Sequence, residues 1–283
     1  MTTNDFNSKK IAVVFNESVK NPYPVLQNLE QELIDRGANP EVLELKELKY
    51  GFDFVFAVGG DGTILHVAKF FAMTQTPVLG INLGRLGFLS QINSENIKYA
   101  INCVYENKFH IEKRIMLKSD KYQALNDFVI KGVSQTRSAK FVLKINDKFV
   151  CDYVADGLII STPTGSTAYG LSAGGPVLNP NIEAFVIVPI CPHTLNARPI
   201  VIPANENITI TSIEDDVSEF KLIVDGSEII ETDSNIIIEK AEHMANLALL
   251  ENDEFYSVLR NKLNWGVAPK SIWLNLFTLK ITY

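Results

Sequence analysis

The sequence has few of the residues that build disulfide or metal-binding scaffolds. Its 283 residues include three scattered cysteines (Cys103, Cys151 and Cys191) and four dispersed histidines. Unpaired, odd-numbered cysteines indicate reduced and packed thiols in a cytoplasmic protein. No His/Cys cluster has the spacing of metal ligands, so the sequence predicts no metal site made by protein side chains alone.

Basic charge and long apolar runs are also scarce. The net charge is −7, the first ten residues are polar, and no apolar run approaches the roughly 20 residues of a membrane span. We therefore expect no secretory signal and neither a nucleic acid nor a membrane as partner. Any phosphate that binds must be met locally, by backbone amides, a few Lys or Arg side chains and a divalent cation.

The hydrophobic pattern changes character near residue 111. Before it, strand-like runs alternate with helical patterns, which predicts a Rossmann-like α/β domain with a parallel sheet and helices on both faces. After it, short β-branched segments separated by turn residues predict a mostly antiparallel β domain. We expect the α/β domain over 1–114, the β domain over 115–250 and a final helix over about 251–266 that packs back on the first domain. The site is expected between the domains.

The chain is organised around a glycine turn, Gly59-Gly60-Asp61-Gly62-Thr63. A buried strand pattern precedes this turn and a helical pattern follows it, which brings bare backbone N–H groups to a helix N-terminus and favours phosphate binding. A plain Asp-Gly turn is the alternative. The spacing matches neither GxGxxG nor GxxxxGK[ST]. Asp61 stands where an anion should bind, which suits a carboxylate that handles a proton or a metal ion.

A second segment, 161–178, is rich in glycine and hydroxyl side chains. It is suited to wrap a polar ligand, and Tyr169 within it is placed to stack on a base; a mobile surface loop is the alternative reading. Asn126-Asp127 and Asp225-Gly226, taken alone, are most often turns. His193, taken alone, is most often a buried histidine with its hydrogen bonds satisfied.

Together these motifs resemble the NAD kinase family, which moves the γ-phosphate of ATP to the 2′-hydroxyl of the adenosine ribose of NAD, giving NADP and ADP. The glycine turn is shared with diacylglycerol kinases, sphingosine kinases and phosphofructokinases, whereas the stretch 162–169 is much more specific. The matching segments, in order, are 59–63, 82–89, 125–127, 156–176, 193–199, 225–226 and 259–266.

The resemblance implies roles for particular residues. Asp61 would be the general base or hydrogen-bond acceptor facing the ribose 2′-hydroxyl, and a divalent ion, most simply Mg²⁺, would bridge the ATP oxygens. Family members assemble as homodimers or homotetramers. The residues implied to bind substrates are Gly59, Gly60 and Gly62 at the phosphates, Asn126 and Asp127 at the NAD adenosine, Thr167, Ala168 and Tyr169 at the adenine, Ser172 in the same segment, and Asp156 at the nicotinamide half.

One departure and two alternatives stand beside the resemblance. Val154 occupies a position where the family often has Arg, which leaves the preference between NAD and NADH open. A lipid kinase of the diacylglycerol type would need a basic or amphipathic membrane-facing surface that this acidic chain does not offer. A catalytically silent NAD(P)-binding sensor could dispense with Asp61, which is present in its full motif.

Overall fold

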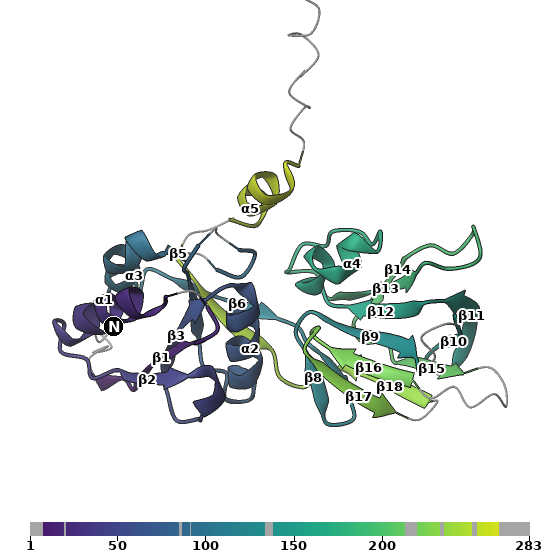
Figure 1. Ribbon diagram of the computed structural model, residues 1–283, viewed down its shortest axis with the longest axis horizontal. Coiled ribbons are helices and arrows are strands. Elements are labelled where there is room, and N and C mark those ends of the chain that lie inside the picture. The colour runs from purple at the N-terminus through teal and green to yellow at the C-terminus, as the bar shows by residue number, and fades with distance from the viewer. Residues whose placement is uncertain are drawn as a thin grey trace, which may run out of the picture.

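The computed structural model describes residues 8–19, 21–84, 87–90, 92–133, 138–212, 220–232, 235–250 and 254–265. The tail 267–283 lies outside them. Two domains lie side by side, with the last helix above the space between them (Figure 1). No helix of these residues is long and apolar enough to cross a membrane.

A seven-stranded sheet forms the first domain, in the order β2-β1-β3-β4-β19-β6 with β5 beside β4, and all its pairings are parallel except that of β6 with β19. Its strands are β1 (Ile11–Phe15), β2 (Glu41–Glu44), β3 (Phe54–Gly59), β4 (Val78–Asn82), β5 (Ile92–Asn93), β6 (His110–Arg114) and β19 (Ala245–Leu249). Its helices are α1 (Tyr23–Ile34), α2 (Asp61–Phe71) and α3 (Ile97–Tyr105), with 3₁₀ turns η2 (Leu45–Glu47), η3 (Ala72–Thr74) and η4 (Ser94–Asn96). The chain therefore returns to this sheet at Ala245, inside the range expected for the β domain.

Helices cover both faces of this sheet, as predicted. Successive side chains of a strand point to opposite faces, so Ile11 and Val13 pack with α1 and α3 in one core cluster. Ala12 and Val14 pack with α2 in the other. The sequence of β1 is apolar at every position because both of its faces are buried.

The second domain is a sandwich of two six-stranded antiparallel sheets, which confirms the predicted β domain. The sheet orders are β11-β10-β15-β18-β7-β8 and β14-β13-β12-β9-β16-β17. One core cluster joins them; in it the rings of Phe141 and Phe220 stack with centroids 5.2 Å apart. The strands are β7 (Leu117–Ser119), β8 (Tyr122–Ala124), β9 (Asp127–Gly132), β10 (Ala139–Ile145), β11 (Lys148–Ala155), β12 (Gly157–Ser161), β13 (Ala184–Ile190), β14 (Ile200–Pro203), β15 (Ile208–Ser212), β16 (Phe220–Val224), β17 (Glu228–Thr232) and β18 (Asn235–Lys240).

Specific polar contacts connect the two domains. Lys69 of α2 pairs with Asp225, which follows β16, at 3.0 Å. The guanidinium of Arg114, at the end of β6, donates to the Thr164 hydroxyl at 3.1 Å. Helix α2, which carries Lys69, lies on the side of the first domain that faces the second (Figure 1).

The last helix, α5 (Glu254–Leu263), contacts both domains. Its Tyr256 hydroxyl accepts a hydrogen bond from Asn179 of the β domain at 3.2 Å. Phe255 and Val258 line a pocket of about 160 Å³ together with residues of β19 and of the loop after β4. Helix α5 therefore spans the junction between the domains.

Candidate active site

The glycine turn places Asp61 in the first turn of α2. Strand β3 is buried at every position and ends at Gly59, and Gly60 is the N-cap of the helix. The amides of Thr63 and Ile64 donate to the Gly60 carbonyl, so the amides of Asp61 and Gly62 precede the first intrahelical hydrogen bond. A β-carbon on Gly60 or Gly62 would meet no atom within 4 Å, so the turn is open to a ligand.

The loop after β4 holds the Asp61 carboxylate. Asp61 Oδ2 accepts from the Phe88 amide at 2.7 Å, and Oδ1 accepts from the Leu89 amide at 3.3 Å. The Ser90 hydroxyl lies 3.5 Å from Oδ1 and itself accepts from the side-chain amide of Asn82 at 2.9 Å. A carboxylate offers about four acceptor positions, and one third of the Asp61 side chain remains exposed. The carboxylate is thus fixed in direction yet open on one side.

Asp225 connects α2 to the segment that contains Asn126 and Asp127. The side chain of Asp225 is only 2% exposed. It accepts hydrogen bonds from the amides of Leu125, Asn126 and Asp127 at 3.2, 2.7 and 3.2 Å. With the Lys69 ion pair, these bonds tie the start of β9 to a helix position eight residues after Asp61, about 12 Å along the axis. Asp225-Gly226 does form the turn before β17, but its carboxylate positions the start of β9 as well.

Asp127 is a buried carboxyl group. Burial, followed by the negative charge of Asp225, raises the pKa of Asp127 to about 7. Asp225 accepts three amide hydrogen bonds and pairs with Lys69, and the raised pKa makes Asp127 the carboxyl group that takes a proton. Near neutral pH this side chain can therefore act as donor or acceptor.

The first part of the hydroxyl-rich segment, residues 161–166, is packed into the domain, so the alternative of a surface loop is wrong for these residues. Ser161, Thr162 and Ser166 are each at most 1% exposed. The Thr162 hydroxyl donates to the Leu125 carbonyl at 2.6 Å, and that of Ser166 donates to Pro163. Position 165 requires glycine, because the β-carbon of any other residue would lie 2.1 Å from the Asn126 carbonyl oxygen. Most of these hydroxyls form hydrogen bonds that hold the loop, whereas Ala168 and Tyr169, which follow it, line a pocket.

A pocket of about 390 Å³ brings several predicted residues together. Two short helical turns, η5 (Gly165–Thr167) and α4 (Tyr169–Ser172), carry the predicted adenine-binding residues. The Thr167 hydroxyl donates to the Thr164 carbonyl at 3.2 Å, and Ser172 is exposed one turn after Tyr169. The pocket is lined by Asn126, Asp127, Val129, Lys131, Ala168, Tyr169, Ile223, Asp225 and Gly226. It is a candidate site for a flat, polar ring system, since an aromatic ring and amide groups meet in it.

Asp156 lies at the opposite end of β12 from the Asp127 pairing. It precedes β12, and the far end of that strand, Ser161, pairs with Asp127. Five residues of strand therefore separate Asp156 from Asp127, about 16 Å, while the neighbouring Gly157 lies beside Lys131, which lines the pocket. Asp156 instead lies beside Ser138, whose hydroxyl is 3.3 Å from Asp156 Oδ1 and 2.7 Å from Nε2 of His193. His193 is exposed, so the reading of it as a buried histidine is wrong.

The sequence reasoning assigned no role to several residues of the site. Ser90 directly follows the matching segment 82–89, and this position was the one feature of the sequence that could have suggested a role for Ser90 in the site. Lys69 and Lys262 lie on helices whose periodicity was clear, but periodicity does not show which polar face meets the site. Asp225 was visible as a turn residue, and its contacts across 98–100 positions of sequence were not.

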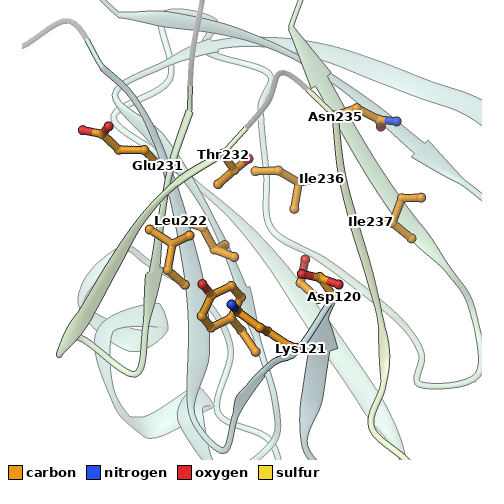
Figure 2. Close-up of a pocket in the computed structure, with 11 residues that line it drawn as sticks. Asp120, Lys121, Leu222, Glu231, Thr232, Asn235, Ile236 and Ile237 are labelled. Carbon is orange, nitrogen blue, oxygen red and sulfur yellow. The ribbon is translucent and has the colours of Figure 1, made fainter.

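A larger pocket, of about 630 Å³, lies away from these residues. It is lined by the turn between β7 and β8 together with β16, β17 and β18 (Figure 2). Figure 2 shows Asp120 and Lys121 at that turn and Ile236 and Ile237 on β18. None of the predicted site residues lines it.

Family models match both domains of the chain. The model described as the ATP-NAD kinase N-terminal domain matches residues 4–109, and the model described as the ATP-NAD kinase C-terminal domain matches residues 125–250. An NAD kinase of Caldanaerobacter subterraneus subsp. tengcongensis is 36% identical over 280 residues, which cover 90% of this chain and 99% of that protein. An NAD kinase of a Marinomonas species is 40% identical over 232 residues, covering 78% and 79%.

Solved structures show the same architecture. The crystal structure of an NAD kinase from Archaeoglobus fulgidus in complex with ATP is 26% identical, with a TM-score of 0.74, and the match covers 90% of this chain and 98% of that one. Yeast NADH kinase complexed with NADH has a TM-score of 0.80 at 22% identity, covering 93% and 89%, and so shares the fold.

Proposed function

From the premise that this chain belongs to the ATP-NAD kinase family, we propose how its own residues transfer the γ-phosphate of ATP to the 2′-hydroxyl of the adenosine ribose of NAD. The products are NADP and ADP. The two family models cover both domains, which removes the diacylglycerol-type lipid kinase as an alternative. The observation that carries the proposal is the Asp61 carboxylate, held by backbone amides at the N-terminus of α2 with one side open.

Asp61 acts as the base toward the ribose hydroxyl. An alcohol is a poor nucleophile, and a carboxylate within hydrogen-bond reach takes its proton as the bond to phosphorus forms. The Phe88 and Leu89 amides keep the carboxylate aimed without neutralising it. The amides of the turn formed by Gly59, Gly60 and Gly62 hold the ATP phosphates, because the N-terminus of α2 favours negative charge.

The 390 Å³ pocket takes the NAD adenosine. Asn126 and Asp127 offer amide and carboxyl groups to it, and Ala168 and Tyr169 offer a small side chain and an aromatic face. Thr167 and Ser172 flank that segment. The Lys69–Asp225 pair fixes the start of β9 relative to α2, which supports an adenosine ribose held within reach of Asp61.

Asp156 serves the nicotinamide half of NAD, since the neighbouring Gly157 lies beside Lys131 at the end of the pocket away from Asp127. The chain forms a homodimer or homotetramer, and in such an assembly the NAD that Asp156 faces belongs either to its own copy or to another. Mixing inactive Asp61→Asn with Asp156→Ala subunits distinguishes these cases, because mixed oligomers would regain part of the activity that each variant lacks only if that NAD belongs to another copy. Size-exclusion chromatography coupled to light scattering gives the number of subunits.

The residues present fit a Mg²⁺ ion carried mainly by ATP. Among the described residues no cluster of three or more His, Cys, Asp or Glu side chains could hold a metal. Mg²⁺ usually keeps several waters and binds mainly through substrate phosphates, which leaves Asp61 to act as the base. Bound to the ATP phosphates, the ion would neutralise their charge. Turnover that survives chelation of divalent ions would overturn this assignment.

A cytoplasmic location is also part of the proposal. The three cysteines are free thiols, one of them exposed. Free thiols are typical of proteins kept in a reducing compartment.

Replacing Asp61 by Asn tests the proposed function. The variant should lose turnover by about 100-fold or more, measured as NADP formed in a coupled assay with an NADP-specific dehydrogenase. NAD affinity, measured by calorimetry, should change little, because the adenosine pocket is intact. Equal loss of turnover and of NAD affinity would make Asp61 a binding residue. NADP formation at the unaltered rate would remove it from the mechanism.

A further inference from the structure

Lys262 of α5 lies at the catalytic carboxylate. Its Nζ is 3.8 Å from Oδ2 of Asp61, and each side chain is about one-third exposed, at 32% and 33%. The same ammonium lies 5.4 Å from the centre of the Phe88 ring, on the residue whose amide donates to Asp61. The ammonium of Lys262 therefore contacts both the Asp61 carboxylate and Phe88, whose amide orients that carboxylate.

The helix holds this lysine in place. Leu259 is 5% exposed, and Phe255 lines the small pocket beside Phe88 and Leu89. Phe255, Leu259 and Lys262 follow the spacing of a single helix face. Lys262 therefore extends from the anchored face of α5 toward Asp61, while the neighbouring Arg260 is exposed.

Other cations near the site are already bound. Lys69 is 3.0 Å from the buried Asp225, and Arg114 is paired with Glu112. In the part of the chain that the structure describes, the ion pair of Lys262 with Asp61 is longer than a charge-assisted hydrogen bond. The three N–H donors of Lys262 therefore remain available for a group that binds an ammonium more tightly than Asp61 does.

We propose that Lys262 binds the γ-phosphate of ATP and stabilises its charge during transfer. ATP-binding loops of the GxxxxGK[ST] type carry their own lysine, and the turn at 59–63 has none. Here the lysine comes from the opposite end of the chain, at the junction between the domains. Its position also separates the negative charge of Asp61 from that of the phosphate, which would otherwise repel each other.

The transfer step then balances with the residues in place. The bond from the ribose 2′-oxygen to the γ-phosphorus forms as the bond from that phosphorus to the β–γ bridging oxygen breaks. The hydroxyl proton goes to Asp61, and ADP leaves with the electron pair. Lys262 stays protonated and holds the non-bridging γ-oxygens throughout.

Variants of Lys262 with a matched control test this assignment. Lys262→Met should lower kcat by about 100-fold, and Lys262→Arg should restore part of it, because the positive charge returns. Arg260→Met removes one positive charge from the same turn of α5 and should stay within about twofold of the original activity. Thermal melting with and without NAD checks that each variant folds, and Lys262→Gln replaces the Met variant if that one does not.

Binding by calorimetry distinguishes the γ-phosphate from the other phosphates. Lys262→Met should weaken ATP affinity at least about tenfold more than ADP affinity, with NAD affinity unchanged. Because this inference rests on ATP as the donor in the proposed function, a binding readout that needs no turnover keeps the two tests separate. Equal weakening of ATP and ADP would place Lys262 on the inner phosphates and overturn the proposal. So would a folded Lys262→Met enzyme that behaves like Arg260→Met.

Discussion

Gly87 leaves the space that the Asp61 carboxylate occupies. A β-carbon built on Gly87 would lie 1.5 Å from Asp61 Oδ1. The three atoms nearest to that β-carbon all belong to the Asp61 carboxyl group, so the conflict is with the carboxylate. The amide of Gly87 also donates to the Ser90 hydroxyl at 2.6 Å, which keeps this backbone close to Asp61.

Gly87→Ala should therefore displace the Asp61 carboxylate, which we propose as the base. We expect kcat to fall by about 100-fold, since a displacement of about 1 Å at a reacting group has that effect. The NAD affinity should stay near its original value. Steady-state kinetics together with calorimetry checks both expectations.

Gly84→Ala is the matched control in the same loop. A β-carbon there meets only Asn82 Oδ1, at an ordinary 3.8 Å, so activity should be retained. Equal activity of the Gly87 and Gly84 variants would show that the carboxylate can move without loss of function.

Lys69→Met should remove the ion pair that joins α2 of the first domain to Asp225 of the second and so destabilise the protein. It leaves the buried Asp225 charge with three amide hydrogen bonds but no counter-ion, and we expect a loss of about 2 kcal/mol in unfolding free energy. In the double variant with Asp225→Asn, the two effects should not add, because one interaction is removed twice. Denaturant unfolding of the four proteins measures this coupling.

An exposed ion pair provides the comparison. Lys49 and Glu41 are 2.5 Å apart but about half exposed, at 55% and 48%. Lys49→Met should change stability by no more than about 0.5 kcal/mol. Strict additivity at Lys69 and Asp225 would show that their contact does not stabilise the native state.

The sequence predicted the elements better than the contacts between them. Strand β3 and helix α2 were predictable because apolar periodicity and glycine punctuation are local properties. The start of the helix differs from the expectation: the helical pattern was expected to follow the turn 59–63, but the helix begins within that turn, at Asp61, because Gly60 accepts the first helical hydrogen bonds. This difference puts Asp61 inside the first turn.

The supporting residues of the site could not be predicted for a physical reason. Ser90 acts through a hydroxyl that meets a carboxylate 29 positions away, and Asp225 acts on amides about 100 positions away. Such contacts depend on how strands are ordered in two sheets, which local patterns do not encode. The hydroxyls of 161–167 show the converse. Their composition suggested ligand contacts, but four of them donate to backbone carbonyls, three within the segment and one at Leu125.

Asp127→Asn should stabilise the protein at alkaline pH and have less effect in acid. The pKa of Asp127 is raised from 3.8 to about 7 by burial, then by Asp225. Between these values the folded state binds more protons than the unfolded state, so unfolding free energy falls as pH rises. The stability linked to this group is fully present below about pH 4 and is lost as pH rises through 7, by up to about 4 kcal/mol.

Melting temperatures at pH 5 and pH 8 check this expectation. The difference between Asp127→Asn and the original protein should increase from pH 5 to pH 8, because asparagine carries no charge to bury. Asp120→Asn makes the same chemical change in an exposed turn and should show no such pH dependence. If the two variants respond to pH alike, the carboxyl group of Asp127 is not held neutral by its surroundings, and its pairing with Asp225 does not set the stability of the pocket.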